Sequence, residues 1–326
     1  MIVTFTPNPS LDRTIAVAEL RVGEVHRASA MRDDAGGKGV NVSRALAANG
    51  SPTVAVLPAG GAPAVQFAAL LYDADVSYDF IDLQGAVRTN ITLVEDDGTT
   101  TKINEPGRDS GPLDAEVMLD AVQSHLDGAS WVVGCGSLPP GIDGSIYVAL
   151  VERARAAGVR VAIDTSGEAF AQVVKARPDL VKPNLEELEE FAGRPLVLLA
   201  DVLDAARSLV SSGVGTVVVS LGEHGALGVD ATTAVHARAV VDKPLSTVGA
   251  GDCLLAGYLC AVEVGASLTD AVATGVLWVA AAVALPGSRV QSPADLKGSV
   301  VRVSPSLPLN MIVTSTNGHS APTHEG

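Results

Sequence analysis

A run of small residues beside a carboxylate is the part of the sequence best suited to chemistry. Residues 246–252 read STVGAGD, and an apolar helical pattern follows them directly. Gly249, Ala250 and Gly251 at a helix start let consecutive backbone N–H groups point at one place, where the helix dipole also favours negative charge. Such amides can hold the charge on a transferring phosphoryl group, and Asp252 can accept the proton of an attacking hydroxyl. The alternative is an ordinary helix start, where Asp is favoured.

A second glycine-rich segment, residues 36–46 (GGKGVNVSRAL), combines close backbone approach with a cation and an amide. Its three glycines bring the backbone near a ligand, Lys38 offers a positive charge to a phosphate, and Asn41 offers an amide to sugar hydroxyls. The segment is not a Walker loop, because the six-residue spacing and the Lys-Ser/Thr ending are missing. A glycine-rich helix entry with a solvated lysine is the alternative.

Small and polar residues follow several other predicted strands. The turn at residues 6–13 (TPNPSLDR) leaves the first strand, and Asp12 in it can either accept hydrogen bonds from sugar hydroxyls or cap the turn. Three further segments of this kind are 134–141 (GCGSLPPG), 181–187 (VKPNLEE) and 219–227 (VSLGEHGAL). Because the carboxyl ends of parallel strands meet at one edge of a sheet, we expect these segments to line that edge.

The elements that must position these residues alternate along the chain. Short β-rich runs separated by Ala-rich helical patterns predict an α/β fold, with a mostly parallel sheet covered by helices on both faces. We expect strands at 2–6, 53–57, 131–134, 160–164, 180–182 and 216–220, and helices at 39–49, 145–157, 185–191, 202–212 and 251–264. The apolar stretch 271–285 is too short to span a bilayer and predicts a buried core helix.

Two segments break this alternation, at about residues 11–32 and 86–105. Both alternate apolar with polar residues, and the second contains the turn EDDG at 95–98. This pattern predicts antiparallel strands that form a small appended sheet, with a lid as its function. After residue 305 the chain becomes rich in Ser, Pro, Thr, Asn and His, so we expect one folded domain over 1–305 and a flexible tail over 306–326.

Composition limits the classes of partner. The chain has 326 residues, of which 47% are hydrophobic and 18% charged, so it can bury a large core. Its formal net charge of −15 argues against nucleic-acid and membrane partners, because both need a positive surface. The three cysteines have no disulfide or metal spacing, and the N-terminus reads as a strand rather than a signal peptide, so we expect a cytoplasmic protein.

The segments GGKGVN, GSLPPG, KPNLEE, VSLGEHGAL and STVGAGD, in this order and spacing, resemble the PfkB carbohydrate kinase family over about residues 1–305. The resemblance implies a ribokinase-like three-layer αβα sandwich with a mostly parallel central sheet and a small β-sheet lid. It also implies ATP as co-substrate and Mg²⁺ as cofactor. Within the family, TPNPSLDRT, the lysine of GGKG, RTNI and KINEPG look most like the 1-phosphofructokinases and tagatose-6-phosphate kinases.

The resemblance also implies a role for each matching residue. The catalytic group comprises the base and the amides of the anion hole: Asp252, Gly249, Ala250 and Gly251. The sugar and its phosphate would be held by Asp12, Gly37, Asn41, Lys38, Arg88, Ser137 and Arg27. The nucleotide would be held by Lys182, Asn184, Ser220, Gly222 and Gly225. Asn184 and Glu187 would help to place Mg²⁺ through water, since this ion keeps much of its hydration shell.

The leading hypothesis is transfer of the γ-phosphoryl group of ATP to the 6-hydroxyl of fructose 1-phosphate. Tagatose 6-phosphate and fructose 6-phosphate are the alternative acceptors, whereas a riboside or adenosine would leave Lys38 and Arg88 without a phosphate. A non-catalytic sugar- or nucleotide-binding regulator is a third class. A Rossmann dehydrogenase is disfavoured, because G-x-G-x-x-G is absent after the first strand. Since the edge strands of a small lid need cover, we expect two lids to pair in a homodimer.

Overall fold

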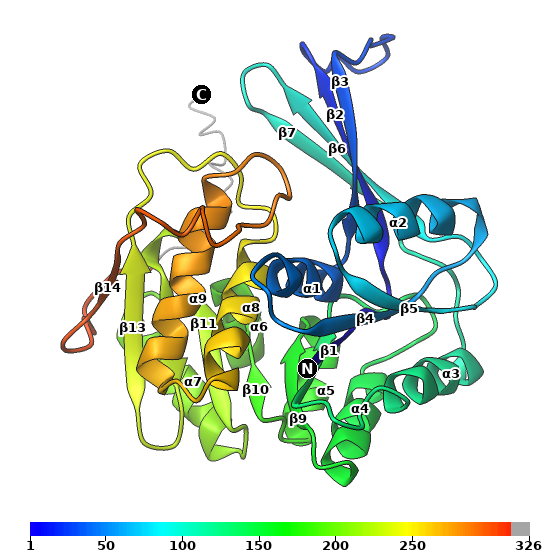
Figure 1. Ribbon diagram of the computed structural model, residues 1–326. Coiled ribbons are helices and arrows are strands. Elements are labelled where there is room, and N and C mark those ends of the chain that lie inside the picture. Colours follow the sequence, from blue (N-terminus) through cyan, green and yellow to red (C-terminus); the bar gives the residue numbers. More distant parts are fainter. Residues whose placement is uncertain (314–326) are drawn as a thin grey trace, which may run out of the picture.

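The structure, a computed structural model, describes residues 1–313 and consists of a large sheet between two helical layers, with a second sheet projecting from it (Figure 1). The large sheet has ten strands in the order β14-β13-β12-β11-β10-β9-β8-β1-β4-β5. Their bounds are β1 Ile2–Phe5, β4 Thr53–Pro58, β5 Ser77–Ile81, β8 Trp131–Cys135, β9 Arg160–Asp164, β10 Leu180–Val181, β11 Thr216–Ser220, β12 Ala226–Val229, β13 Ala234–Ala239 and β14 Val301–Val303. In this spatial order, the neighbouring strands β11, β10, β9, β8, β1, β4 and β5 pair in parallel. At the other end, β12, β13 and β14 continue the sheet with antiparallel pairing.

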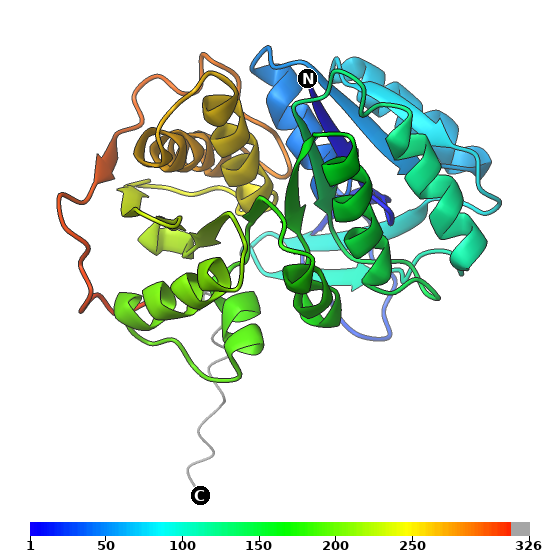
Figure 2. The same cartoon turned by 90° about the horizontal axis from the view of Figure 1, so that it is seen from below.

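Helices cover both faces of this sheet, as the view from below shows (Figure 2). One layer packs on the core around Val3, Val132 and Val217 and consists of α3 Pro112–Gln123, α4 Ser145–Ala156, α5 Gly167–Lys175, α6 Leu185–Ala192 and α7 Leu199–Ser211. The other layer consists of α1 Lys38–Ala48, α2 Gly61–Asp73, α8 Ala250–Glu263 and α9 Leu268–Val283. Neighbouring residues of one strand, such as Ile2 and Val3, enter opposite cores, which explains the near-continuous apolar runs.

The expected αβα architecture is confirmed, and every predicted strand and helix is present. The apolar stretch at 271–285 lies in α9 and is largely buried, as expected. The outer strands β5 and β12 to β14, and helices α2, α3 and α5, were not predicted. Within residues 1–313, no helix has both the length and the apolar character needed to cross a bilayer.

The predicted lid is a four-stranded sheet in the order β3-β2-β6-β7. Its strands are β2 Ser10–Val17, β3 Ala30–Gly36, β6 Arg88–Glu95 and β7 Thr100–Asn104. The expectation of purely antiparallel pairing is wrong, because β2 and β6 pair in parallel with Ser10 opposite Arg88. The reason is that both strands leave the same edge of the large sheet and therefore run outward in the same direction (Figure 1).

Part of the segment that was predicted to be a flexible tail is folded. Leu199 N donates to Met311 O at 2.9 Å, Val313 N donates to Val197 O at 2.9 Å, and the Val313 side chain is buried. The flexible tail predicted over 306–326 is therefore wrong for residues 307–313, which pack beside the start of α7. The rest of that prediction, residues 314–326, lies outside the described residues.

Candidate active site

The segments singled out in the sequence meet at one edge of the large sheet, where Asp252 forms the centre of a site. Asp252 lies in the first turn of α8, with 6% of its surface exposed. Gly249 precedes the helix with a φ of 76°, in the left-handed region that glycine adopts without strain. Asn41 in α1 donates from Nδ2 to Asp252 Oδ2 at 2.9 Å. Two helix starts that lie far apart in the sequence are therefore joined at the carboxylate.

The electrostatic environment of Asp252 suits a general base. Burial and the nearby charge of Asp164 raise the pKa of Asp252 to about 6, against the opposing effects of Lys38 and of the hydrogen bond from Asn41. A carboxylate with this pKa is mostly ionised at neutral pH and is a stronger base than an exposed one. Asp252 can therefore accept a proton from a hydroxyl placed beside it.

A buried carboxylate that the sequence did not single out, Asp164, holds two lysines at the site. Asp164 is 1% exposed at the end of β9, and its Oδ1 lies 2.8 Å from Lys38 Nζ. Its Oδ2 lies 3.0 Å from Lys182 Nζ. Burial acts to raise the pKa of Asp164, but the two lysines outweigh burial and hold that pKa below its usual range. The feature of the sequence that could have identified Asp164 is its position at the end of a predicted strand, on the edge of the sheet where the other segments meet.

Lys38 lies between the groups expected to bind sugar and those expected to bind nucleotide. Besides its contact with Asp164, Lys38 Nζ lies 3.4 Å from Glu187 Oε1. Burial disfavours its charge, but the carboxylates of Asp164 and Glu187 outweigh burial and hold the pKa of Lys38 above its usual range. Lys38 therefore carries a positive charge at neutral pH.

The side of the site that is predicted to bind the sugar is formed by the base of the lid. Asp12 on β2 accepts hydrogen bonds at Oδ1 from Ser10 Oγ at 2.7 Å and from Asn90 Nδ2 at 3.0 Å. A Cβ on Gly36 of β3 would overlap the Asp12 carboxylate, so this packing requires glycine. Asn90 Oδ1 is buried without a hydrogen-bond partner among residues 1–313, which leaves an acceptor for a ligand. Asn90 belongs to the RTNI segment, for which the family resemblance implied a role only at Arg88.

Arg88 and Ser137 meet beside Asp12, as the resemblance implied. Arg88 donates from Nη1 to Glu105 O at 2.9 Å, and from Nη2 to Asn8 O at 3.1 Å and Ser137 Oγ at 3.3 Å. Its Nε is buried without a partner within residues 1–313. The guanidinium is therefore held in place and still has a donor to offer.

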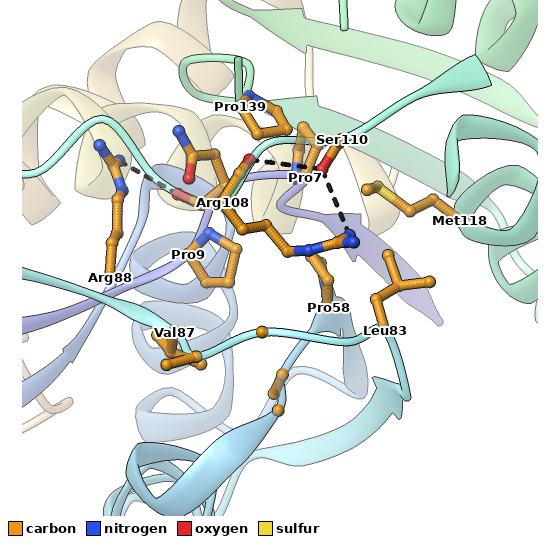
Figure 3. Close-up of a pocket in the computed structure, with 15 residues that line it drawn as sticks. Pro7, Pro9, Pro58, Leu83, Val87, Arg88, Arg108, Ser110, Met118 and Pro139 are labelled. Atoms are coloured by element: carbon orange, nitrogen blue, oxygen red, sulfur yellow. Dashed lines mark hydrogen bonds between the residues drawn. The ribbon is translucent and has the colours of Figure 1, made fainter. Parts of the chain in front are cut away.

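A small pocket of about 20 Å³ lies next to Arg88, where the lid joins the large sheet (Figure 3). This volume is enough for one water molecule and too small for a sugar. Arg108 reaches across it to Ser110 Oγ at 3.3 Å, away from Arg88 (Figure 3). We therefore do not assign the pocket to substrate.

The predicted nucleotide-binding segments follow β10 and β11 side by side. Ser220 N donates to Pro183 O at 3.1 Å, which places the end of β11 against Asn184. The next turn contains the short 3₁₀ helix η1, Gly222–His224, and ends at Gly225, whose φ is 88°. A Cβ at Gly225 would overlap the backbone of β13, so only glycine fits there.

Asn184 and Glu187 form a reciprocal cap at the start of α6. Asn184 N donates to Glu187 Oε2 at 2.8 Å, and Glu187 N donates to Asn184 Oδ1 at 2.7 Å. Both side chains are therefore fixed at the edge of the site. Within residues 1–313, no group of three or more His, Cys, Asp or Glu side chains is arranged to hold a metal ion.

Arg27 was predicted to help bind the phosphate of the sugar, but the fold does not bring it to the other predicted site residues. Arg27 is exposed in the loop between β2 and β3. This loop lies at the end of the lid away from α1 (Figure 1). Of the residues predicted to bind the sugar phosphate, those that the fold brings together are Asp12, Gly37, Lys38, Asn41, Arg88 and Ser137.

Comparison with known proteins places this site in a family. Residues 6–295 match the pfkB family carbohydrate kinases. A 1-phosphofructokinase of Rhodobacter capsulatus is 41% identical over 82% of this chain and 86% of its own length, and one of Haloferax volcanii is 36% identical over 91% and 95%. The solved structure of phosphofructokinase-2 from Escherichia coli in complex with substrates and products superposes with a TM-score of 0.84, at 32% identity over 91% of this chain and 97% of that one. The chain therefore belongs to the pfkB family of carbohydrate kinases.

Proposed function

We propose that the protein transfers the γ-phosphoryl group of ATP to the 6-hydroxyl of fructose 1-phosphate, giving fructose 1,6-bisphosphate and ADP. The observation that carries the proposal is the buried Asp252 carboxylate at the amide-rich start of α8, held by Asn41 and faced by Lys38. The choice of fructose 1-phosphate is supported by the relatives from Rhodobacter capsulatus and Haloferax volcanii, both named 1-phosphofructokinase.

In the proposed reaction, Asp252 accepts the proton of the sugar 6-hydroxyl as its oxygen attacks the terminal phosphorus. The bond from that phosphorus to the β–γ bridging oxygen breaks, and ADP leaves. The N–H groups of Gly249, Ala250 and Gly251 would hold the charge on the transferring group, aided by the α8 dipole. Most of the catalysis then comes from alignment and charge stabilisation, as is usual for phosphoryl transfer.

The sugar would be oriented by groups from both sheets. We propose that Asp12, Gly37 and Asn41 bind its hydroxyls, with the free Oδ1 of Asn90 as a further acceptor. Its phosphate would be bound by Arg88 and Ser137, with Lys38 between this phosphate and the nucleotide. Because Arg88 is already fixed by two backbone carbonyls, little side-chain entropy is lost when it binds.

The nucleotide would lie along Lys182, Asn184, Ser220, Gly222 and Gly225. Asn184 and Glu187 suit Mg²⁺ that is held mainly by water and phosphate oxygens, because their own oxygens already take part in the α6 cap. When bound, Mg²⁺ would neutralise phosphate charge. Glu187 also contacts Lys38, so the same carboxylate would orient a cation that faces the phosphates.

A panel of sugar phosphates tests the proposed function. Initial rates with ATP and fructose 1-phosphate, fructose 6-phosphate or tagatose 6-phosphate should give the highest kcat/KM for fructose 1-phosphate. The second candidate is 6-phosphofructokinase activity, because the ATP-dependent 6-phosphofructokinase isozyme 2 of Escherichia coli is 35% identical over 90% of this chain. A higher kcat/KM for fructose 6-phosphate would favour it, and ATP turnover with none of the three would contradict the proposal.

Arg88→Ala should raise the KM for fructose 1-phosphate by about 10- to 100-fold, because a charge-assisted contact with its phosphate is lost. The KM for ATP should stay close to that of the native protein. Lys38→Ala should also raise the KM for the sugar phosphate. Steady-state kinetics with each substrate varied measures these changes. Arg108→Ala is the matched control, since Arg108 points to the opposite side of the small pocket (Figure 3), and an equal KM increase in it would contradict the assignment.

The rate should fall in acid, because protonated Asp252 cannot accept a proton. With the pKa of Asp252 at about 6, kcat should approach a plateau above that pH. Below it, kcat should decrease by about tenfold for each pH unit. The measurement is kcat at saturating substrate, since kcat reports groups in the bound complex and avoids the titration of the free sugar phosphate. A kcat that stays constant down to pH 4.5 would contradict the role of Asp252 as base.

We also propose that two copies associate through the lid. Ile15 lies opposite Met31 and Leu93 in adjacent strands, so these apolar side chains share one face of the lid sheet. Met31 is 63% exposed, and Ile103 on the same face is 55% exposed. Covering this face with a second lid would remove both side chains from water. Self-association also occurs in a relative, since a tetrameric inhibited form of Escherichia coli phosphofructokinase-2 has been solved.

Light scattering at assay concentration should therefore give the mass of a dimer. Met31→Glu should give the mass of a monomer, because a charge would be buried between the two lids. Val264→Glu, at an exposed position after α8, is the control and should remain dimeric. A monomeric native protein would contradict the proposal.

We propose the cytoplasm as the place of this reaction. Cys135, Cys253 and Cys260 are free thiols. Burial raises the pKa of Cys253 to about 12, so it stays a thiol beside Asp252. A reducing compartment keeps such cysteines free.

A further inference from the structure

Arg44 belongs to the glycine-rich segment at 36–46 but takes no part in the proposed chemistry. Its side chain is 11% exposed, and its guanidinium contacts the lid strand β3 as well as α1. Nη1 donates to Asn41 Oδ1 at 3.3 Å and to Ala35 O at 3.3 Å, and Nη2 lies 3.9 Å from Asp34 Oδ1. One largely buried side chain therefore contacts both the partner of Asp252 and the lid.

The contact with Arg44 decides which way the Asn41 amide points. An amide has an acceptor at one end and donors at the other. Because Oδ1 accepts from Arg44, Nδ2 is directed to Asp252 Oδ2, to which it donates at 2.9 Å. A rotated amide would place its oxygen against the Asp252 carboxylate and its NH₂ group against the guanidinium, and both contacts would be repulsive.

The position of Arg44 depends in turn on β3. This strand ends at Gly36 and continues into α1 through Gly37 alone. Asp34 is also paired with Arg32, at 2.7 Å, and Arg32 Nη2 donates to Ser288 Oγ at 3.3 Å in the loop after α9. The lid strand is thus held to the body of the protein on either side of the residues that contact Arg44.

We propose that Arg44 is a positioning residue, which holds the Asn41 amide toward Asp252 and makes this alignment depend on the position of lid strand β3. The inference rests on the proposed role of Asp252 as the catalytic base. With β3 in place, Asp252 receives a hydrogen bond that keeps it ionised and fixes one of its oxygens. If β3 moves away from α1, Arg44 loses its contacts with Ala35 and Asp34. The Asn41 amide is then no longer held in its orientation.

The other charged groups that face Asp252 do not depend on Arg44. They are Lys38 on α1, Asp164 at the end of β9 and Lys182 after β10. Lys38 and Lys182 are both held by Asp164. Removing Arg44 should therefore affect Asp252 through Asn41.

The first test is the Arg44→Met variant of the full chain. Its kcat with ATP and fructose 1-phosphate should fall about tenfold, which is the effect of one misplaced hydrogen bond. The acidic limb of its kcat–pH profile should move up by about half a pH unit, because a donor to the Asp252 carboxylate is lost. Arg44→Lys should show the same changes, since a shorter side chain with a single nitrogen cannot contact Asn41 and Ala35 as Nη1 does and also replace Nη2 beside Asp34. Thermal unfolding is followed in parallel, because a purely structural role would change the melting temperature and leave the pH limb of the folded enzyme in place.

Two neighbouring residues of β3 provide the second test and its matched control. Asp34→Asn should lower kcat about threefold through its contact with Arg44, and it should cause no further loss in the Arg44→Met background. Asp33→Asn removes the charge that pairs with Arg13, at 2.7 Å and 2.9 Å on the other face of the lid, and should leave kcat unchanged.

Arg44→Met with native kcat and a native pH limb would overturn the proposal. If Arg44→Met does not fold, equal kcat values for Asp34→Asn and Asp33→Asn would overturn it. An inactive native protein would instead overturn the proposed function itself, so the two failures are distinguishable.

Discussion

Replacing Asp252 by Asn should lower kcat with fructose 1-phosphate by roughly 10²- to 10⁴-fold, while the affinity for ATP stays near that of the native protein. Asn has nearly the same shape, and its side-chain oxygen can still accept the hydrogen bond from Asn41. What it lacks is the ability to take up a proton at neutral pH. Steady-state kinetics gives kcat, and calorimetric titration with ATP gives the affinity.

The control for this experiment is Asp270→Asn. Asp270 is also in the first turn of a helix, α9, but it is exposed and accepts a hydrogen bond from Ser267 Oγ at 2.7 Å. Its replacement should leave kcat unchanged. An Asp252→Asn variant with full turnover would show that the proton leaves by another route and would contradict the proposed mechanism.

Replacing Lys182 by Met should lower the free energy of unfolding by about 2–4 kcal/mol, because it leaves the buried Asp164 carboxylate with a single cation. The Lys182 and Asp164 side chains are both almost completely buried at 3.0 Å from each other. Lys38, at 2.8 Å, remains as the second partner and keeps the loss at the lower end of the range for a broken buried pair. Urea unfolding of the native protein and the variant measures the difference.

Two further variants decide whether the loss comes from the unpaired charge. Asp164→Asn added to Lys182→Met removes that charge and should recover part of the lost stability. Arg194→Met breaks an exposed pair with Asp201, at 3.2 Å, and should cost less than about 1 kcal/mol. If the double variant is less stable than Lys182→Met alone, the buried charge is not the cause.

The sequence and the structure agree best where a residue's role depends on its immediate neighbours in the chain. The parallel strands and their helices follow from apolar periodicity, which is a local property. The glycines at 37, 225 and 249 all have positive φ values, and their place after strands or before helices was visible as turn chemistry. For the same reason, Asp252 could be proposed as a base before its surroundings were known.

The sequence-based predictions and the structure differ where a residue's interaction partner is distant in the chain. In the sequence, nothing distinguishes Asp164 from other residues at strand ends. Its role becomes visible in the fold, where Lys38 and Lys182 both pair with it. Residues 307–313 (LPLNMIV) are mostly apolar, but they lie in a longer stretch rich in Ser, Pro, Thr, Asn and His whose composition predicts a tail. In the fold they form hydrogen bonds beside α7. The resemblance implied a role for Arg27 through a loose match in the lid, and Arg27 lies at the far end of the lid, because the length of the β2–β3 hairpin sets its position.

The kinase class, the αβα architecture and the strand-end segments that meet at one edge of the large sheet could all be predicted from the order of the amino acids. These follow from periodicity, turn chemistry and motif order, all of which act over a few residues at a time. The hydrogen bond from Asn41 to Asp252, the two lysines held by Asp164 and the contact of Arg44 with the lid are visible only once the chain is folded. Each of these contacts depends on how separate segments are placed in space, and on burial that makes an unpaired charge or a rotated amide costly.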